Sequence, residues 1–288
     1  MRFSAFSWLP GSGVSVLFLS LLFPAAALSA QTAPALAAGS ANYAVYQGDK
    51  VVGSGDYNIQ PTPNGFTITS HGKLNLTKFS YSFTNTQHLD HERNLVSDQL
   101  SGTVNGSPVT FTINSDPTGR QFQISINANG KLTQNTVDRH QHLVLLPDLD
   151  PAAYMLLTRV VMDNPPTSWI LIPKQDGILV PSTIERGASV HGKLNGSLMD
   201  VQHATVSMNS ENPINVDLFY AADGRVLEAD LPQQNFFVVR DGFKLVDRPK
   251  PSAPAAPPQS SPQPNPQRGA LQQYPAPPQG NYPQMTQQ

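Results

Sequence analysis

A pair of histidines two residues apart has a spacing suited to metal chelation. His140 and His142 flank a single glutamine. Successive side chains of a strand point to opposite faces, so both imidazoles share one face if residues 139–145 form a strand. Zinc would then take a third ligand from a neighbouring strand. We name His140 and His142 as candidate metal ligands but expect neither a metal nor a cofactor, because a chain with seven histidines places some of them close together by chance.

Catalytic signatures are missing from the sequence. His88-Leu-Asp-His91-Glu92 contains metal-ligand types, but its order differs from the helical zinc-protease motifs, and the segment is typical of a polar turn. The chain has no Gly-x-Ser-x-Gly elbow, no P-loop and no dinucleotide fingerprint. We expect a non-enzymatic protein without catalytic residues. A hydrolase-like enzyme stays an alternative, because two carboxylates that folding brings together leave no pattern in a sequence.

An aromatic stripe is the main candidate for ligand contact. Phe79, Tyr81 and Phe83 alternate with small polar residues and therefore share one strand face. The stripe either packs in the core or lines a pocket for an acyl chain or another apolar ligand, since both uses need the same side chains. Together with Tyr154 and Leu157, these residues are the predicted ligand-lining set.

One helix is expected over residues 151–162. Asp150 is a good N-cap, Pro151 suits the first helical position, and Asn164 stops the helix. Apart from a threonine and an arginine, the segment is apolar on nearly every side. This pattern is typical of a buried helix.

The rest of residues 42–247 predicts strands. Apolar and polar residues alternate most clearly in 109–113, 122–126 and 214–220. Between such runs stand Asn-Gly or Asp-Gly pairs, which tolerate the positive φ of tight hairpins, at 64–65, 105–106, 129–130, 195–196 and 223–224. The fold class expected is mainly β: about a dozen strands in a large curved antiparallel sheet, a half-barrel or open barrel, wrapped around the short apolar helix.

The first thirty residues have the layout of a secretory signal peptide. Arg2 supplies a positive charge, an apolar run covers 14–23, and small residues follow Pro24. The run is about half of the roughly 20 residues that cross a bilayer. We expect cleavage between residues 27 and 37, and a mature protein that is soluble in the periplasm or secreted.

Composition limits the partners. The chain has no cysteine, which excludes disulfides and a lipid-modified cysteine. Its formal net charge is −2, so it carries no basic excess for nucleic acid. No second apolar run approaches membrane-spanning length. We expect a lipid or other apolar ligand, no nucleic acid and no transmembrane segment in the mature chain.

The C-terminal residues 248–288 differ from the rest. Proline, glutamine, serine, alanine and asparagine dominate them, and Tyr274 and Tyr282 are their only aromatic residues. Such a segment buries too little apolar surface to offset the entropy of ordering. The expected organisation is a signal peptide (1–30), a disordered linker (31–41), a β-rich domain (42–247) and a disordered Pro/Gln-rich tail (248–288).

Three short segments support a resemblance to a family. They are Tyr43-Ala-Val-Tyr-Gln-Gly48, Gly177-Ile-Leu-Val-Pro-Ser182 and Ala221-Ala-Asp-Gly-Arg-Val-Leu-Glu228. The chain resembles uncharacterised bacterial exported domains of the LolA/LolB-like half-barrel class. The resemblance implies a half-barrel fold with a cavity for an apolar molecule. It carries over no catalytic residue, and fold alone does not define function.

Two functions in addition to the enzyme alternative remain open. A ligand-binding envelope protein predicts a cavity on the order of several hundred Å³ between sheet and helix. An envelope interaction or scaffold protein, tethered through its Pro-rich tail, predicts a filled core. The interior volume of the sheet distinguishes the two.

Overall fold

The computed structural model describes residues 36–173, 177–210 and 213–249. The expected signal peptide and residues 250–288 of the expected tail lie outside these ranges. The chain divides into two compact units after Asp247, and every described helix and strand belongs to the first unit.

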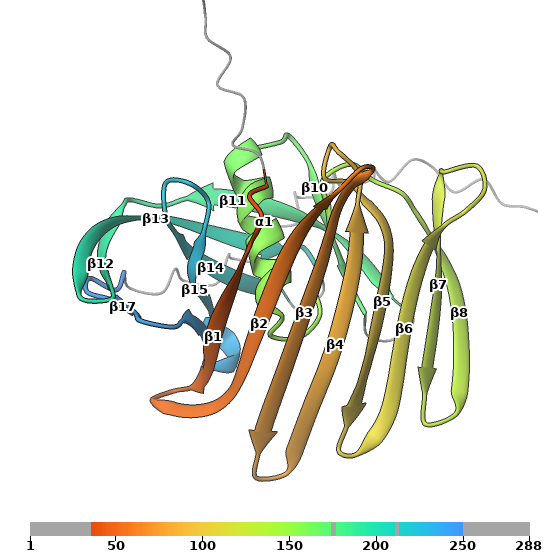
Figure 1. Cartoon of the computed structure of the whole chain (residues 1–288), viewed down its shortest axis with the longest axis horizontal. Coiled ribbons are helices and arrows are strands. Elements are labelled where there is room, and N and C mark those ends of the chain that lie inside the picture. The colour runs from red at the N-terminus through yellow and green to blue at the C-terminus, as the bar shows by residue number, and fades with distance from the viewer. Residues whose placement is uncertain (1–35, 174–176, 211–212, 250–288) are drawn as a thin grey trace, which may run out of the picture. The chain divides into compact units, whose positions relative to one another are not determined.

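The N-terminal half is an antiparallel meander in which each strand pairs with the next (Figure 1). Apolar residues at alternate positions face inward, as in β4 and β6, where buried and exposed residues alternate. The strands are β1 (Gly39–Gln47), β2 (Lys50–Thr62), β3 (Gly65–Leu76), β4 (Phe79–Leu89), β5 (Leu95–Val104), β6 (Ser107–Ser115), β7 (Gln121–Ala128) and β8 (Lys131–Asp138).

Tight hairpins form where Asn-Gly pairs predicted them. Asn105 and Gly106 have φ values of 50° and 78° between β5 and β6, and Asn129 and Gly130 have 54° and 77° between β7 and β8. Both residues of such a turn need positive φ, which asparagine and glycine adopt at least cost. The hairpin prediction is confirmed at these positions.

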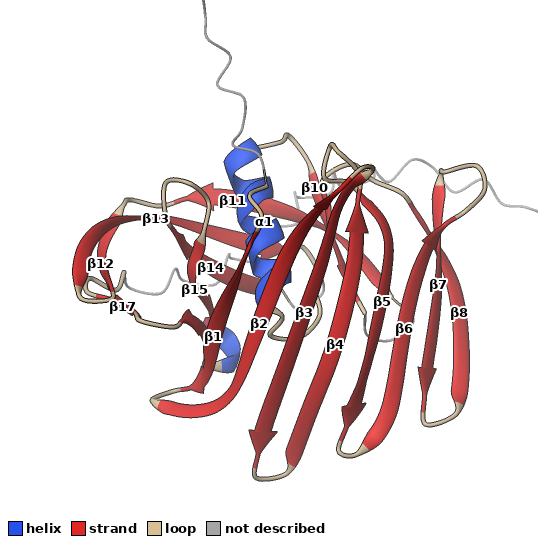
Figure 2. Ribbon diagram, in the orientation of Figure 1, coloured by secondary structure: helices blue, strands red, loops and turns tan. Residues whose placement is uncertain are grey.

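The C-terminal half contains the helix and shorter strands (Figure 2). Its elements are β9 (Leu143–Leu145), α1 (Pro151–Asp163), β10 (Ser168–Ile172), β11 (Ile178–Arg186), β12 (Val190–Leu194), β13 (Ser197–Met208), β14 (Ile214–Tyr220), β15 (Val226–Leu231), the 3₁₀ helix η1 (Pro232–Gln234), β16 (Phe236–Arg240) and β17 (Phe243–Leu245). Because β16 pairs with β1, both halves form one sheet.

The sheet is large, curved and open. From β1 it runs one way through the meander to β8, and the other way through β16, β15, β14, β13, β11 and β10 to β9. Among the described residues, β8 pairs with β7 alone and β9 with β10 alone. These two strands are therefore the ends of this run of strands, and β12 and β17 form a side branch from β13. The predicted fold class, a mainly β protein with a curved sheet around one helix, is confirmed.

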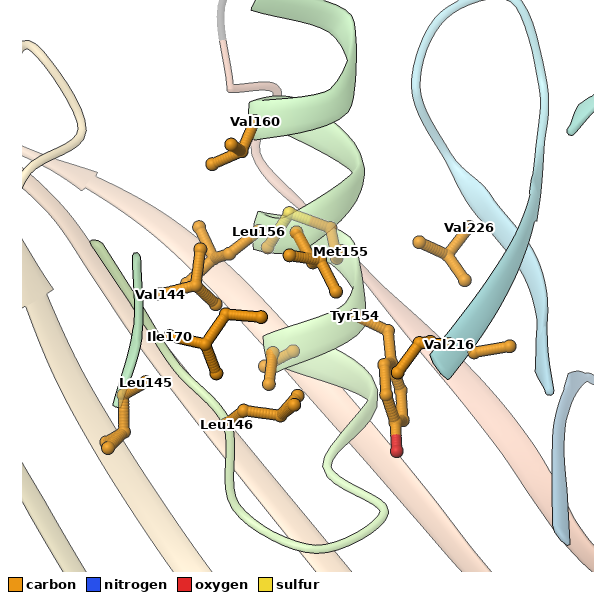
Figure 3. Packing of buried hydrophobic residues seen from close by; sticks show 14 of the residues in the cluster. Val144, Leu145, Leu146, Tyr154, Met155, Leu156, Val160, Ile170, Val216 and Val226 are labelled. Carbon is orange, nitrogen blue, oxygen red and sulfur yellow. The ribbon is translucent and has the colours of Figure 1, made fainter. Parts of the chain in front are cut away.

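Helix α1 lies against the concave face of this sheet and is buried from Pro151 through Val161. The Asp150 side chain accepts a hydrogen bond of 2.9 Å from the Ala152 N–H, and Asn164 ends the helix with φ of 48°. Helix side chains pack against residues of β9, β10, β14 and the start of β15 (Figure 3). No helix in the described ranges is both long and apolar enough to cross a bilayer.

Three expectations need correction. The described residues contain 17 strands rather than about a dozen, because several have only three to five residues and leave no clear alternation. Strands β9 and β10 are parallel, since α1 connects them as a crossover. Strand β15 is buried on both faces rather than one, because a second apolar cluster covers its outer side.

Candidate functional site

A cavity of about 180 Å³ lies beside α1. It combines apolar walls with three arginines. Its lining residues come from the start of β1, from β2, from α1, from the turn between β14 and β15 and from the end of β16: Leu36, Ala37, Ala38, Gly39, Ser40, Tyr57, Ile59, Met155, Arg159, Gly224, Arg225 and Arg240. We call this the arginine cavity.

Arg159 reaches the cavity from the C-terminal half of α1. The turn before β15 passes close to its guanidinium, and a Cβ added at Gly224 would lie 2.8 Å from Arg159 Nη1. A side chain there would require the ends of Arg159 and Met162 to shift, and the φ of 83° at Gly224 itself favours glycine. Burial, and after it the charge of Arg93, lowers the pKa of Arg159.

Arg225 and Arg240 line the cavity from the turn between β14 and β15 and from the end of β16. Arg225 Nε donates to Asp223 Oδ2 at 2.6 Å, which fixes this guanidinium at the turn. Arg240 stands opposite Tyr43 in the register of β16 and β1. Tyr43 is 1% exposed, and its hydroxyl donates to the Val226 carbonyl at 3.0 Å. The strand position opposite Arg240 is therefore held in place by burial and by a hydrogen bond.

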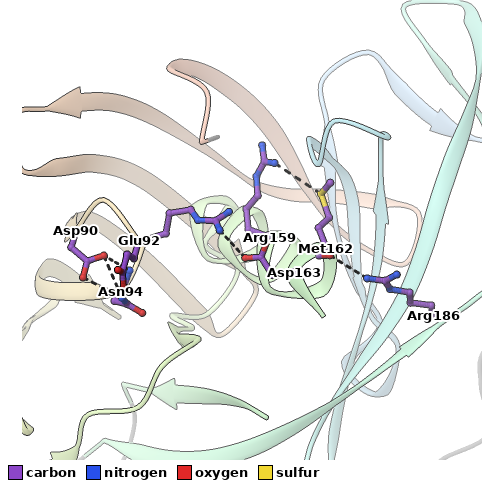
Figure 4. A network of polar contacts seen from close by, with 8 residues as sticks. Asp90, Glu92, Asn94, Arg159, Met162, Asp163 and Arg186 are labelled. Atoms are coloured by element: carbon purple, nitrogen blue, oxygen red, sulfur yellow. Dashed lines mark hydrogen bonds and ion pairs between the residues drawn. The ribbon is translucent and has the colours of Figure 1, made fainter. Parts of the chain in front are cut away.

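Two further arginines stabilise the C-terminal end of α1 (Figure 4). Arg186 Nη2 donates to the carbonyls of Val161 and Met162 at 2.8 and 3.2 Å. Arg93 pairs with Asp163 at 3.0 Å. The free carbonyls at a helix C-terminus carry partial negative charge, so cations stabilise this end.

The arginine cavity has the chemistry of a binding site. Among the described residues, the charged groups of its lining are the three arginines. Arginine presents a planar set of donors that matches a carboxylate or phosphate. The lining therefore provides donors for an anionic head and apolar contact for a hydrocarbon part.

A separate polar cluster lies buried between α1 and the strands β3 to β5. Ser70 Oγ donates to Asp150 Oδ2 at 3.0 Å, and Asn85 Nδ2 lies 3.4 Å from the same oxygen. Asp98 is 3% exposed and stands opposite Gln87. Burial raises the pKa of Asp150 to about 6, and burial followed by the charge of Asp150 raises the pKa of Asp98. We call this the buried acid cluster.

Two other cavities are less suited to a ligand. One of about 30 Å³ lies between α1 and the loop before β5, and it holds about one water molecule. The other, of about 610 Å³, is an open groove on β6 to β8. Apart from Ile124, its lining consists of the uncharged polar side chains Thr112, Asn114, Gln123, Ser125, Gln134, Asn135 and Thr136.

The predicted ligand-lining residues occupy different environments. Tyr154 and Leu157 are each 1% exposed within the core, and Phe83 is 5% exposed. Tyr81 stacks against Phe83 with ring centroids 5.3 Å apart, whereas Phe79 lies at the surface. None of these five residues lines the arginine cavity, the 30 Å³ cavity or the open groove. Their contact with a ligand stays a prediction.

The two candidate metal ligands do not share a strand face. Residues 139–142 form a loop and turn, and the strand starts only at Leu143. His140 stacks on Trp169 with ring centroids 4.0 Å apart, and His142 has a φ of 54°. The expected strand over 139–145 is therefore wrong in its first part. In the described ranges, no three metal-binding side chains come together.

Sequence reasoning missed the arginine cavity. Arg159 stood out only as the charged residue of an otherwise apolar helix, and Arg225 and Arg240 lie more than 60 residues further along the chain. A charged residue inside an apolar helix was the one available signal, because a buried arginine needs partners.

Comparisons with known proteins give a fold likeness. The chain matches no known protein-family model, and no curated protein matches it in sequence. A β-barrel-like protein of the domain of unknown function DUF1849 from Brucella abortus aligns with 75% of this chain and 100% of its own, at 11% identity and a TM-score of 0.47. A DUF1089 family protein from Pseudomonas aeruginosa aligns with 65% of this chain and 92% of its own, at 9% identity and a TM-score of 0.40.

Proposed function

We propose that this protein is a non-enzymatic, exported binding protein of the bacterial envelope, and that its ligand is a small amphiphile with an anionic head. The arginine cavity is the observation that carries this proposal. Export itself is supported by the signal-peptide layout of residues 1–30. The anionic head refines the expectation of a lipid or other apolar ligand.

The charges around the cavity favour an anion. Three arginines, Arg159, Arg225 and Arg240, line it, and one nearby acid, Asp223, pairs with Arg225 and also acts on Arg159, so the positive charges outnumber this acid. Burial makes the positive charge of Arg159 costly, and a bound carboxylate or phosphate adds compensation for it. Tyr57, Ile59 and Met155 add apolar contact for the ligand body.

The volume limits the size of the ligand. Pockets for drug-sized molecules hold roughly 300–1,000 Å³. At about 180 Å³ the arginine cavity is smaller, so it accommodates a short chain or the head and first carbons of a longer one. The core around Tyr154 and Leu157 is filled, so the proposed site is this smaller cavity beside α1 rather than the cavity of several hundred Å³ expected between sheet and helix.

Three ligands with the same eight-carbon chain test the proposal. Octanoate, 1-octanol and octyltrimethylammonium, all below their micelle concentrations, are titrated into the mature protein by calorimetry. We expect saturable 1:1 binding of octanoate alone. Equal binding of all three, or none of octanoate, contradicts the proposal.

Matched arginine variants locate the site. We expect Arg240→Gln to weaken octanoate binding about tenfold, since a charge-assisted hydrogen bond contributes about 1.5–3 kcal/mol. Arg120→Gln removes the same charge from an exposed turn between β6 and β7 and leaves binding unchanged. Equal loss in both variants would indicate attraction by net charge rather than a site.

A further inference from the structure

Four hairpin turns lie together at one end of the meander. The turns β1–β2, β3–β4, β5–β6 and β7–β8 all lie at the lower edge in Figure 1, as the antiparallel order of these strands requires. We call this edge the hairpin rim. Because adjacent strands are about 4.8 Å apart, successive turns are about 10 Å apart along it.

Three of these turns carry the same pair of residues, a lysine followed by an exposed apolar side chain. The pairs are Lys50-Val51, Lys78-Phe79 and Lys131-Leu132. Val51 is 63% exposed, Leu132 59% and Phe79 37%, and all three lysines are exposed. The fourth turn, between Val104 and Ser107, is the uncharged pair Asn105-Gly106.

The hairpin rim combines exposed apolar side chains with positive charge. Single exposed apolar residues are ordinary on protein surfaces. Here three of the seven large hydrophobic residues that are most exposed in the described ranges lie on one edge, each next to a lysine. The turns contain one acid, Asp49, so the rim has a net positive charge in a chain whose formal net charge is −2. The positive charge and the apolar side chains therefore occur at the same place.

We infer that the hairpin rim docks on the surface of an anionic lipid bilayer. Lysine ammonium groups attract anionic headgroups, and valine, phenylalanine and leucine partition into the boundary between headgroups and acyl chains. Three contact points about 10–20 Å apart along one edge place all three apolar side chains on the bilayer at once. Only three exposed side chains enter the bilayer, so the expected binding is peripheral and reversible.

Docking is independent of the arginine cavity. The cavity is lined by Gly39 and Ser40 at the start of β1, whereas the rim includes Val51 beyond the end of that strand. Variants of the rim that lose membrane binding should keep octanoate binding. Variants of the arginine cavity that lose octanoate binding should keep membrane binding.

Vesicle co-sedimentation of the mature full chain tests the inference. The probe is phosphatidylcholine vesicles with and without 30% phosphatidylglycerol. We expect binding to the anionic vesicles only. Since each lysine contributes about fivefold, the Lys50→Gln, Lys78→Gln, Lys131→Gln variant binds about 100-fold more weakly.

A matched control separates the rim from net charge. Lys73→Gln, Lys193→Gln and Lys244→Gln remove the same three charges from exposed positions outside the rim turns. We expect this control to keep binding within about threefold of wild type. Equal loss in both variants, or no binding of the wild-type chain to anionic vesicles, overturns the inference.

Side-chain insertion has its own readout. The chain has no cysteine, so a single introduced cysteine takes an environment-sensitive dye at one place. We expect dye on Leu132→Cys to shift to the blue on anionic vesicles, and dye on Leu198→Cys, which is 65% exposed in another hairpin, to stay unchanged. An unchanged spectrum at Leu132→Cys, or the same shift at both, overturns insertion by the rim.

Discussion

The Ser70 hydroxyl donates a hydrogen bond of 3.0 Å to the Asp150 carboxylate, and this contact joins strand β3 to the N-terminus of α1 across 80 residues of sequence. The same carboxylate caps the helix through the Ala152 N–H. One side chain therefore fixes both where the helix begins and where it sits on the sheet.

Ser70→Ala removes this connection. We expect the free energy of unfolding to fall by about 1–3 kcal/mol, because a buried carboxylate loses one of its hydrogen bonds. Urea denaturation measures the change. Ser101→Ala, the same substitution at an exposed position of β5, is the control and should stay within about 0.5 kcal/mol of wild type. Similar losses in both variants would contradict a special role for Ser70.

The buried acid cluster predicts a pH dependence of stability. The folded-state pKa of Asp150 is about 6, above its usual 3.8, and that of Asp98 is also raised. A raised pKa means that the fold favours the protonated acid. Its contribution to stability is therefore present below about pH 4 and is lost as pH rises through 6. We expect this contribution to raise the melting temperature between pH 7 and pH 5.

Asp98→Asn tests the same cluster. The substitution replaces a buried carboxyl group next to Asp150 with a neutral amide and adds a donor opposite Gln87, whose amide atoms have no hydrogen-bond partner in the described ranges. We expect higher stability at pH 7 and a weaker dependence between pH 5 and 7. The exposed Asp241→Asn is the control and should keep the wild-type pH profile. An unchanged profile in Asp98→Asn would show that Asp98 does not titrate in this range.

The burial of Leu36 predicts where the mature chain begins. It is 3% exposed and lines the arginine cavity, so Leu36→Ala should cost about 2–4 kcal/mol, against less than about 0.5 for the exposed Leu198→Ala. Cleavage at Ala37 would remove this side chain. We therefore expect the intact mass of the exported protein to correspond to a start at or before Leu36. A start at Ala38 with unchanged stability would contradict the packing of Leu36.

Gly224→Ala tests the close approach of the β14–β15 turn to Arg159. Gly196 has the same φ of 83° but nothing within 4 Å of an added Cβ, whereas at Gly224 that atom meets Met162 and Arg159. Gly196→Ala should cost about 1–2 kcal/mol from its backbone alone. We expect Gly224→Ala to cost at least about 1 kcal/mol more and to weaken octanoate binding. Equal costs would show that Arg159 moves aside freely.

Much of the fold follows from local sequence patterns. Alternation in β4 and β6, the Asn-Gly hairpins and the Asp150 cap are local signals, since each depends on residues that are neighbours in the chain. The parallel pairing of β9 with β10 has no such signal, because both strands are short and α1 separates them in the sequence.

The candidate site escaped prediction for a related reason. Arg159, Arg225 and Arg240 meet because β16 pairs with β1 and the turn before β15 lies over α1. These contacts join distant parts of the chain, and one arginine in any of these segments is unremarkable alone. Of the five aromatic and aliphatic residues that the pattern singled out, Phe83, Tyr154 and Leu157 lie in the core, whereas Tyr81 is partly buried and Phe79 is exposed.

The open edges at β8 and β9 have a mechanical consequence. In a closed barrel, the number of strands and their stagger determine the diameter. In this sheet no hydrogen bonds between β8 and β9, among the described residues, set a diameter. The strands bend around α1, so the width of the helix sets the curvature of the sheet. Ala152 and Ala153, which are 1% and 0% exposed, are the buried helix positions with the smallest side chains. A larger residue at either position would push the strands away from the helix and widen the radius of curvature of the sheet.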